Sequence, residues 1–147
     1  MEQMMRIFLD TNVILDWLLG REGAEASMGV FSYAQGKRYV REYTSLLSMA
    51  NIAYICRRNY QPSEIRNVLR KVLKYLSNVL AMSDMVFYNA LECKSPDFED
   101  SLQIQCAEFE CCDVIITRNV SHFKAYTPLP VMTPEEFLSL MGKSATV

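Results

Sequence analysis

The chain has 147 residues, of which 50% are hydrophobic and 22% are charged, and its formal net charge is −2. This length and composition are typical of a single globular domain with a buried core. The slight acidity excludes a general nucleic-acid coat protein, which would be strongly basic, and no apolar run reaches the roughly twenty residues that span a bilayer.

The first half of the chain alternates short apolar runs with longer helical patterns. The helix that begins after residue 44 carries Leu47 and Ile55 at helical spacing. The predicted elements are a strand at 7–9, a buried helix at 13–19, a turn at 20–23, a helix at 24–35, a strand at 41–43 and a helix at 45–58.

The second half continues the same alternation. Ser95 is expected to cap a helix whose first position is Pro96. The predicted elements are a helix from 61, strands at 78–82, 113–117 and 130–132, helices at 86–93 and 97–111, and a terminal helix from 133. Strands separated by helices imply parallel pairing. We expect one domain at 1–142 and a flexible tail at 143–147.

Asp10 stands where the first predicted strand gives way to a helix. In a parallel sheet, the carboxyl ends of the strands form the edge at which ligands bind. Thr11 and Asn12 follow directly, so a carboxylate, a hydroxyl and an amide would surround one point. Two interpretations stay open: Asp10 caps the next helix, or it is a metal ligand at the end of the strand.

A second group of acids opens the helix predicted at 97–111. The positive end of a helix dipole favours acids there, which explains Asp97 and Glu99. Asp100 instead heads a row of apolar residues at three- and four-residue spacing, where an unpaired carboxylate would lose hydration. We therefore predict that Asp100 joins Asp10 as a metal ligand, with Asp97 as an auxiliary, and we expect phosphodiester chemistry.

Further polar positions are candidates for the same site. Asn51 lies in mid-helix beside apolar residues, either as a satisfied core amide or as a neutral ligand that orients metal-bound water. Thr117, Arg118 and Asn119 end the apolar run 114–116 at the same sheet edge, where Arg118 either contacts a phosphate or lies at the surface. His122 is a base, a ligand or a packed ring.

The cysteines and the amino terminus indicate the compartment. The five cysteines are an odd number without the spacing of zinc ligands, and His122 is the only histidine. Residues 1–6 lack the basic start and cleavage site of a signal peptide. We therefore expect reduced, mostly buried cysteines in a cytoplasmic protein that does not associate with membranes.

Three segments resemble motifs of the PIN-domain family. They are residues 9–16, residues 97–103, and residues 115–119 followed by His122 and Phe123. They occur in the order and spacing of the family across nearly the whole chain. The resemblance implies a three-layer α/β/α fold around a mostly parallel five-stranded sheet. It also implies Mg²⁺- or Mn²⁺-dependent ribonuclease activity, often as the toxin of a bacterial toxin–antitoxin pair.

The resemblance carries over residue by residue, with departures. Asp10 and Asp100 match acidic metal ligands of the family. Asn51 falls where many relatives have glutamate, Asn119 where many have aspartate, and His122 where others have another acid. Each departure removes a negative charge and should weaken cation binding. The chain therefore keeps a metal site built on the remaining aspartates, or it is a degenerate member that does not cut RNA.

The leading hypothesis is a metal-dependent endoribonuclease that cleaves single-stranded RNA, with Mg²⁺ or Mn²⁺ as the cofactor. The alternative is a catalytically degenerate module that binds RNA or a partner protein without cleavage. An antitoxin protein and a homodimer are the expected partners, and a basic helix face near residues 66–74 is a candidate for backbone contacts. The predicted site residues are the metal ligands Asp10, Asp97 and Asp100, the further catalytic groups Asn51 and Asn119, and the RNA contacts Asn12, Thr117 and Arg118.

Overall fold

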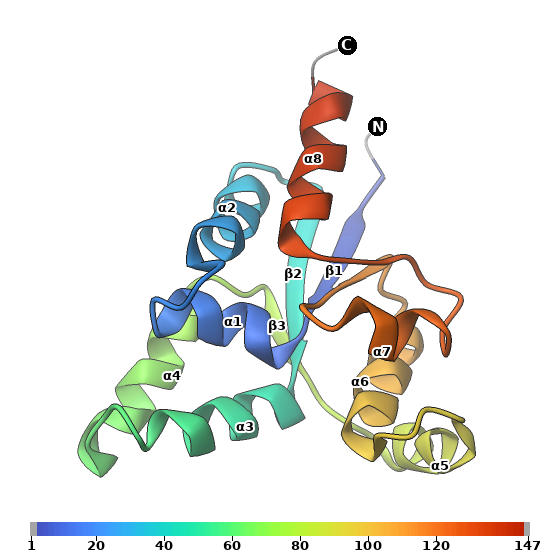
Figure 1. The fold of residues 1–147 in the computed structure, drawn as a ribbon, viewed down its shortest axis with the longest axis horizontal. Coiled ribbons are helices and arrows are strands. Elements are labelled where there is room, and N and C mark those ends of the chain that lie inside the picture. Colours follow the sequence, from blue (N-terminus) through green and yellow to red (C-terminus); the bar gives the residue numbers. More distant parts are fainter. Residues whose placement is uncertain (1–2, 146–147) are drawn as a thin grey trace.

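The computed structural model describes residues 3–145, in which strands and helices alternate (Figure 1). One sheet contains the strands β1 (Met5–Leu9), β2 (Val40–Ser45), β3 (Asn78–Leu80), β4 (Val114–Ile116) and β5 (Val131–Met132). Their order is β3-β2-β1-β4-β5, and every neighbouring pair is parallel. The prediction of a mostly parallel five-stranded sheet is therefore confirmed.

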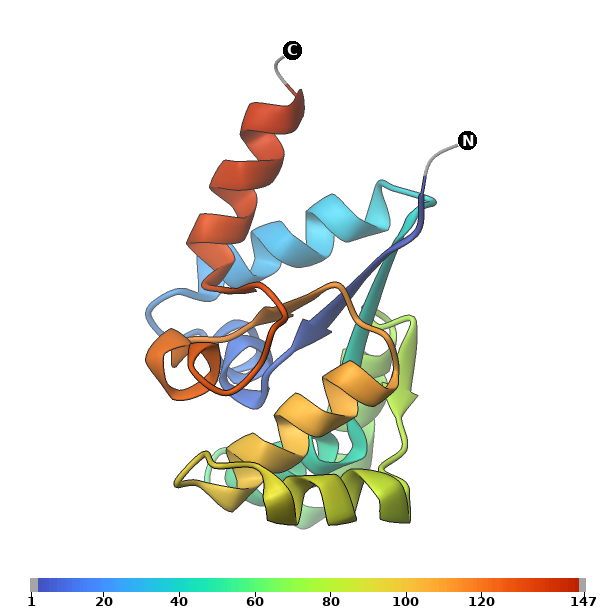
Figure 2. The same ribbon diagram turned by 90° about the vertical axis from the view of Figure 1, so that its right-hand side faces the viewer.

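Helices cover both faces of this sheet. They are α1 (Thr11–Leu18), α2 (Ala24–Gln35), α3 (Leu46–Cys56), the 3-10 helix η1 (Pro62–Glu64), α4 (Ile65–Leu73), α5 (Asp84–Glu92), α6 (Phe98–Phe109), α7 (Val120–Lys124) and α8 (Pro134–Ala145). Figure 2 shows α2 and α8 on one side of the strands and α5 and α6 on the other. Within residues 3–145, no helix is long and apolar enough to cross a membrane.

Side-chain alternation along the strands builds two cores. Ile7 and Leu9 of β1 point into the core that α1, α2, α3, α4 and α8 cover, whereas Phe8 points into the core that α5, α6 and α7 cover. All three side chains are fully buried. A strand covered on both faces needs a continuous apolar run, which is what residues 7–9 supply. The expected three-layer α/β/α architecture is confirmed.

Several element boundaries differ from the prediction. Helix α1 begins at Thr11 rather than at residue 13, because Asp10 already caps it. The cap of α6 is Asp97 and not Ser95, since the Asp97 carboxylate accepts from the backbone N–H of Asp100. Helix α6 ends at Phe109 rather than at residue 111, where Cys111 adopts a positive φ of 58°.

Two differences concern the carboxyl-terminal part of the chain. The loop expected after residue 117 contains the short helix α7, whose pattern is too brief to show periodicity; the burial of Phe123 in the second core holds it in place. Helix α8 continues to Ala145. The rest of the tail expected at 143–147, which is residues 146 and 147, lies outside the described residues.

Glu42 of β2 makes the stability of this fold depend on pH. Its side chain is only 3% exposed, and Gln35 Nε2 donates to its carboxylate at 3.3 Å. Burial raises the pKa of Glu42 from 4.5 to about 7. Below pH 4.5 the carboxyl is protonated in both the folded and the unfolded chain. Between pH 4.5 and 7 the unfolded chain ionises first, so the free energy of unfolding falls as pH rises and levels off above 7.

We therefore expect Glu42→Gln to stabilise the protein at pH 8 by about 2 kcal/mol and to have little effect at pH 4.5. The amide keeps an oxygen that accepts from Gln35 but carries no charge to desolvate. Urea unfolding of both proteins at pH 4.5, 6 and 8 measures the difference, with Glu92→Gln at an exposed position of α5 as the control. A difference that does not grow with pH would contradict this explanation.

Candidate functional site

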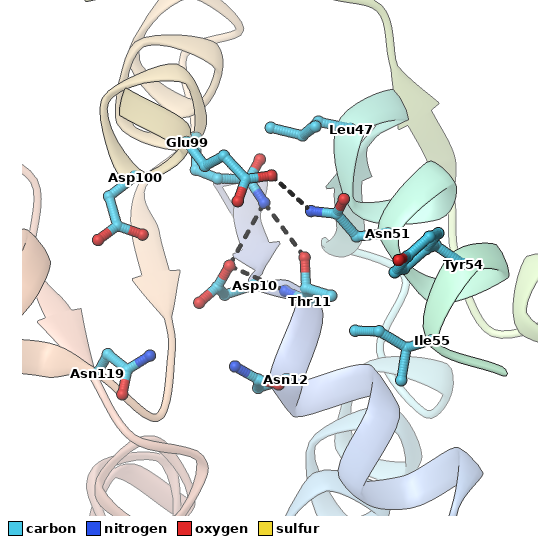
Figure 3. A pocket seen from close by; sticks show the side chains of 11 residues that line it. Asp10, Thr11, Asn12, Leu47, Asn51, Tyr54, Ile55, Glu99, Asp100 and Asn119 are labelled. Carbon is cyan, nitrogen blue, oxygen red and sulfur yellow. Dashed lines mark hydrogen bonds between the residues drawn. The ribbon is translucent and has the colours of Figure 1, made fainter. Parts of the chain in front are cut away.

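A pocket of about 400 Å³ opens at the carboxyl end of β1, between α1, α3 and α6 (Figure 3). Polar side chains from segments far apart in the sequence line most of it. The lining residues are Asp10, Thr11, Asn12, Leu47, Asn51, Tyr54, Ile55, Glu99, Asp100, Gln103 and Asn119. Asp10 and Asp100 therefore share one pocket, as the positions of their elements at one sheet edge predicted.

Asp10 is held at the bottom of this pocket by hydrogen bonds to both carboxylate oxygens. Its Oδ1 accepts from the backbone N–H of Thr11 at 2.9 Å, and its Oδ2 accepts from Thr117 Oγ1 at 2.8 Å. Gln103 Nε2 approaches Oδ1 at 3.4 Å. Burial raises the pKa of Asp10 above its ordinary value, although these hydrogen bonds act in the opposite direction. Asp10 is thus both the cap of α1 and an oriented buried carboxylate.

Gln103 connects Asp10 to a buried polar network that sequence reasoning missed. Its Nε2 donates to Ser48 Oγ at 2.6 Å, and its Oε1 accepts from Ser45 Oγ at 2.5 Å. Thr11 Oγ1 also donates to Ser48 Oγ, at 2.9 Å. All four side chains are buried. The network ties α6 to the start of α3 beneath the pocket. The only sequence signal was that Ser45 also stands at a strand end and that Gln103 follows Asp100 by one helical turn.

The acidic wall of the pocket comes from the first turn of α6. Asp100 and Glu99 both line the pocket, whereas Asp97 does not. Burial, followed by the charges of Asp97 and Asp10, raises the pKa of Asp100 to about 6. Like charges held together in this way favour either a proton or a cation between them. The arrangement can therefore attract a positive ion.

Asp97, predicted as an auxiliary metal ligand, lies outside this pocket and lines the adjacent cavity together with Asp100. Asp97 Oδ1 accepts from the backbone N–H of Asp100 at 3.0 Å, as the cap of α6. Because the cap lies at Asp97 and not at Ser95, the helix starts later than expected and Glu99 is the third carboxylate at the pocket. Sequence reasoning explained Glu99 by the helix dipole alone.

The asparagines predicted for the site all reach the pocket. Asn51 Nδ2 donates to Glu99 Oε1 at 3.2 Å, across the gap between α3 and α6. Asn12 and Asn119 line the side nearer α7, where Figure 3 shows Asn119 below Asp100. Asn51 is therefore not a buried core amide: it is half-buried and pairs with the carboxylate of Glu99.

Arg118 does not face the pocket. Its Nε donates to Asp16 Oδ2 at 2.9 Å, its Nη1 pairs with Glu135, and its Nη2 donates to the carbonyl of Gly23 at 2.9 Å. A side chain at Gly23 would collide with this guanidinium. These contacts join α1, the turn before α2, and α8. They favour a structural role for Arg118 over the predicted RNA contact, whereas its neighbour Thr117 points to Asp10.

His122 lies beside the pocket rather than in it. Its Nδ1 is 3.7 Å from Asp100 Oδ2, and its side chain is 62% exposed. It lines an adjacent cavity together with Asp97 and Asp100. The positive charge of a protonated His122 acts to lower the pKa of Asp100. His122 is therefore a neighbour of the acidic wall from outside.

The donors that converge on the pocket suit a hard divalent cation. Among residues 3–145, no three or more His, Cys, Asp or Glu side chains are grouped so that they could hold a metal ion by themselves. Mg²⁺, however, is commonly held by one or two carboxylates, with water and substrate phosphates completing its shell. Asp10 and Asp100 form such a pair, and the other polar groups of the pocket are the Glu99 carboxylate, four side-chain amides and two hydroxyls. These residues fit Mg²⁺ or Mn²⁺.

Comparison with protein families decides the relationship of this chain. The sequence profile of the PIN domain matches residues 6–121. The chain belongs to the PIN-domain family. That stretch contains every residue that lines the pocket described above. No curated protein sequence is significantly similar to this PIN domain.

Solved structures share its fold at low sequence identity. VapBC2 from Rickettsia felis, bound to a DNA fragment of its promoter, has a TM-score of 0.70 at 16% identity, over 86% of this chain and 97% of that chain. VapBC-1 from nontypeable Haemophilus influenzae has a TM-score of 0.69 at 18% identity, over 89% of this chain and 99% of that chain. A toxin–antitoxin complex from Klebsiella pneumoniae has a TM-score of 0.61 at 20% identity, over 87% of this chain and 97% of that chain.

Proposed function

We propose that this PIN domain is a metal-dependent endoribonuclease that cleaves single-stranded RNA. One observation carries the proposal: Asp10 and Asp100, which lie far apart in the sequence, line the same pocket. The raised pKa of Asp100, caused by burial and by neighbouring carboxylates, is consistent with a site that a cation completes. Perturbed carboxylates in a cleft are typical of functional sites.

Asp10 and Asp100 would hold Mg²⁺ or Mn²⁺ in this proposal. A bound divalent cation supplies Lewis acidity toward the scissile phosphate and makes an attacking water more acidic. Thr117 and Gln103 keep the Asp10 carboxylate in one orientation through their hydrogen bonds. Preorganised ligands of this kind need no rearrangement when substrate arrives.

Neutral groups of the pocket would position the RNA. Asn12 and Asn119 present amides on one side of Asp10, and both can donate to phosphate oxygens. Asn51 and Glu99 close the other side with their hydrogen bond. We assign Asn12, Asn51 and Asn119 to the orientation of phosphate and water, and we assign Thr117 to the support of Asp10 rather than to RNA.

A metal-dependence assay tests this function. We expect the purified protein to cleave a single-stranded RNA with Mn²⁺ or Mg²⁺, to lose cleavage in EDTA, and to regain it when Mn²⁺ is added in excess. Asp100→Asn should lower the rate by about a hundredfold or more, because it removes one of two charged ligands. Asp84→Asn, at an exposed acid in the first turn of α5, is the matched control and should cleave normally. Cleavage that survives EDTA, or an unaffected Asp100→Asn protein, would refute the proposal.

The second candidate is a non-catalytic PIN module that binds RNA or a partner protein. It is favoured by the neutral side chains at Asn51 and Asn119. It is also favoured because no three His, Cys, Asp or Glu side chains among the described residues are grouped so that they could hold a metal ion by themselves. Calorimetry separates the two functions. The nuclease should bind Mn²⁺ at millimolar concentration or below, whereas a degenerate module should show no Mn²⁺ binding at that concentration.

The proposal includes a place in a toxin–antitoxin pair, with an antitoxin protein as partner and a homodimer as the assembled form. The likeness of the fold to a toxin–antitoxin complex supports the partner. Exposed apolar side chains on α5, including Phe87 and Leu91, offer a surface that protein association would bury. The five free cysteines agree with a reducing cytoplasm.

A further inference from the structure

Tyr54 forms a wall that two cavities share. It lies on α3, one turn beyond Asn51, and 62% of it is exposed. On one side it lines the pocket that contains Asp10 and Asp100, as Figure 3 shows. On the other side it lines a cavity of about 340 Å³ at the junction of α3 and α4, which we call the α3–α4 cavity. An extended ligand that leaves the pocket over Tyr54 therefore enters the α3–α4 cavity.

The two cavities have opposite charge. The pocket contains three carboxylates, whereas the residues that line the α3–α4 cavity include Arg57 and Arg66 and no acid. The guanidinium of Arg57 stacks on the ring of Tyr54, with its central carbon 4.3 Å from the ring centroid. Both arginines are exposed. A polyanion held beside the acidic wall would thus meet positive charge and an aromatic surface immediately outside it.

We propose that single-stranded RNA runs from the pocket across Tyr54 into the α3–α4 cavity. A base stacks on the Tyr54–Arg57 pair, and the following phosphates contact Arg57 and Arg66. This inference rests on the proposed nuclease function. Single-strand binding sites combine stacking aromatics with arginines along the backbone, and the net charge of −2 means that such attraction has to be local. Continuity with the pocket and charge complementarity favour RNA over a protein occupant.

Equilibrium binding in EDTA tests the stacking, because binding is then measured without cleavage. Fluorescence anisotropy with a labelled single-stranded RNA of mixed sequence gives the dissociation constant. We expect Tyr54→Ala to weaken binding about tenfold, since stacking on an aromatic ring contributes at this scale, and Tyr54→Phe to bind like the parent. Tyr88→Ala is the matched control: it removes a tyrosine of similar exposure, 56%, from α5 on the other face of the sheet.

The salt dependence of binding tests the arginines. Each phosphate contact to a single strand contributes about 0.7 to the slope of log K against log salt concentration. Arg57→Ala and Arg66→Ala should each reduce the slope by about that amount. Arg38→Ala, at an exposed position before β2, should leave it nearly unchanged because β2 begins at the opposite end of the sheet from the pocket (Figure 1).

The outcomes separate this inference from the nuclease proposal. Tyr54-dependent binding without any metal-dependent cleavage would leave the RNA path intact and refute the nuclease. If the protein shows metal-dependent cleavage but Tyr54→Ala does not change its RNA affinity, the nuclease proposal stands and the RNA path is refuted. An equal loss in Tyr54→Phe, or in Tyr88→Ala, would overturn the stacking, as would a Tyr54→Ala protein that loses only the binding of a partner protein.

Discussion

Replacing Asp10 with asparagine should lower the rate of RNA cleavage by about a hundredfold or more while leaving the fold intact. Loss of a group that merely supports a metal ligand typically costs ten- to a hundredfold, so loss of a ligand itself should cost at least the upper end of that range. The asparagine keeps an oxygen that can accept from Thr11, and the Thr117 hydroxyl can turn to accept from the new amide. Single-turnover cleavage with Mn²⁺ at saturating protein measures the effect.

The stability of the Asp10→Asn protein is part of the same expectation. Burial raises the pKa of Asp10, which means that the ionised carboxylate is costly in the folded protein. A neutral isostere removes that cost, so the melting temperature should stay equal or rise. Lower activity with undiminished stability would identify Asp10 as a functional residue that the fold tolerates. An Asp10→Asn protein that cleaves at the parent rate would eliminate the metal site proposed here.

Arg118→Met should destabilise the protein by about 2–3 kcal/mol, because it leaves Asp16 buried without its close partner. Asp16 is 7% exposed, and the next cation, Arg21, reaches it only at 4.0 Å. The substitution also removes the donors to Glu135 and to the carbonyl of Gly23. Denaturant unfolding at neutral pH measures the loss.

A double-mutant cycle with Asp16→Asn isolates this ion pair. Because Asp16→Asn removes the charge that Arg118→Met leaves unpaired, the double variant should recover much of the lost stability. RNA affinity, measured under conditions where each variant is folded, should not change. Additive losses in the cycle, or a drop in RNA affinity with normal stability, would instead return Arg118 to the RNA-binding role that its place after β4 suggested.

Much of the fold was predictable because its cause is local. The apolar runs at 7–9 and 114–116 are too uniformly hydrophobic for a surface strand, and the helical patterns between strands require parallel pairing. Asp10 was predictable for the same reason, since a strand end followed by small polar groups is visible in a few residues. Asp100 stood out because a carboxylate headed an apolar row on its helix.

The remaining parts of the site depend on contacts between distant segments. Gln103 touches Ser45 and Ser48 only because α6 packs beside the end of β2 and the start of α3, and no local pattern distinguishes it from a surface glutamine. Whether Asp97 or Glu99 lines the pocket depends on which residue caps α6. The sequence Ser95-Pro96 predicted a helix start that is too early, because the cap is Asp97. The partner of Arg118 could not be predicted because Asp16 lies on α1, far from the loop after β4 in the sequence.

The central position of β1 has a consequence for synthesis of the protein. β1 pairs on one side with β2, which follows soon after, and on the other side with β4, which is translated much later. Thr117 and Asn119, which flank Asp10, follow β4 directly. A nascent chain still on the ribosome therefore lacks one wall of the pocket until β4 has emerged. An amino-terminal fragment that ends before Asn119 therefore lacks a complete site. Under the proposed function, a cell that makes this nuclease is protected from the activity of such partial translation products.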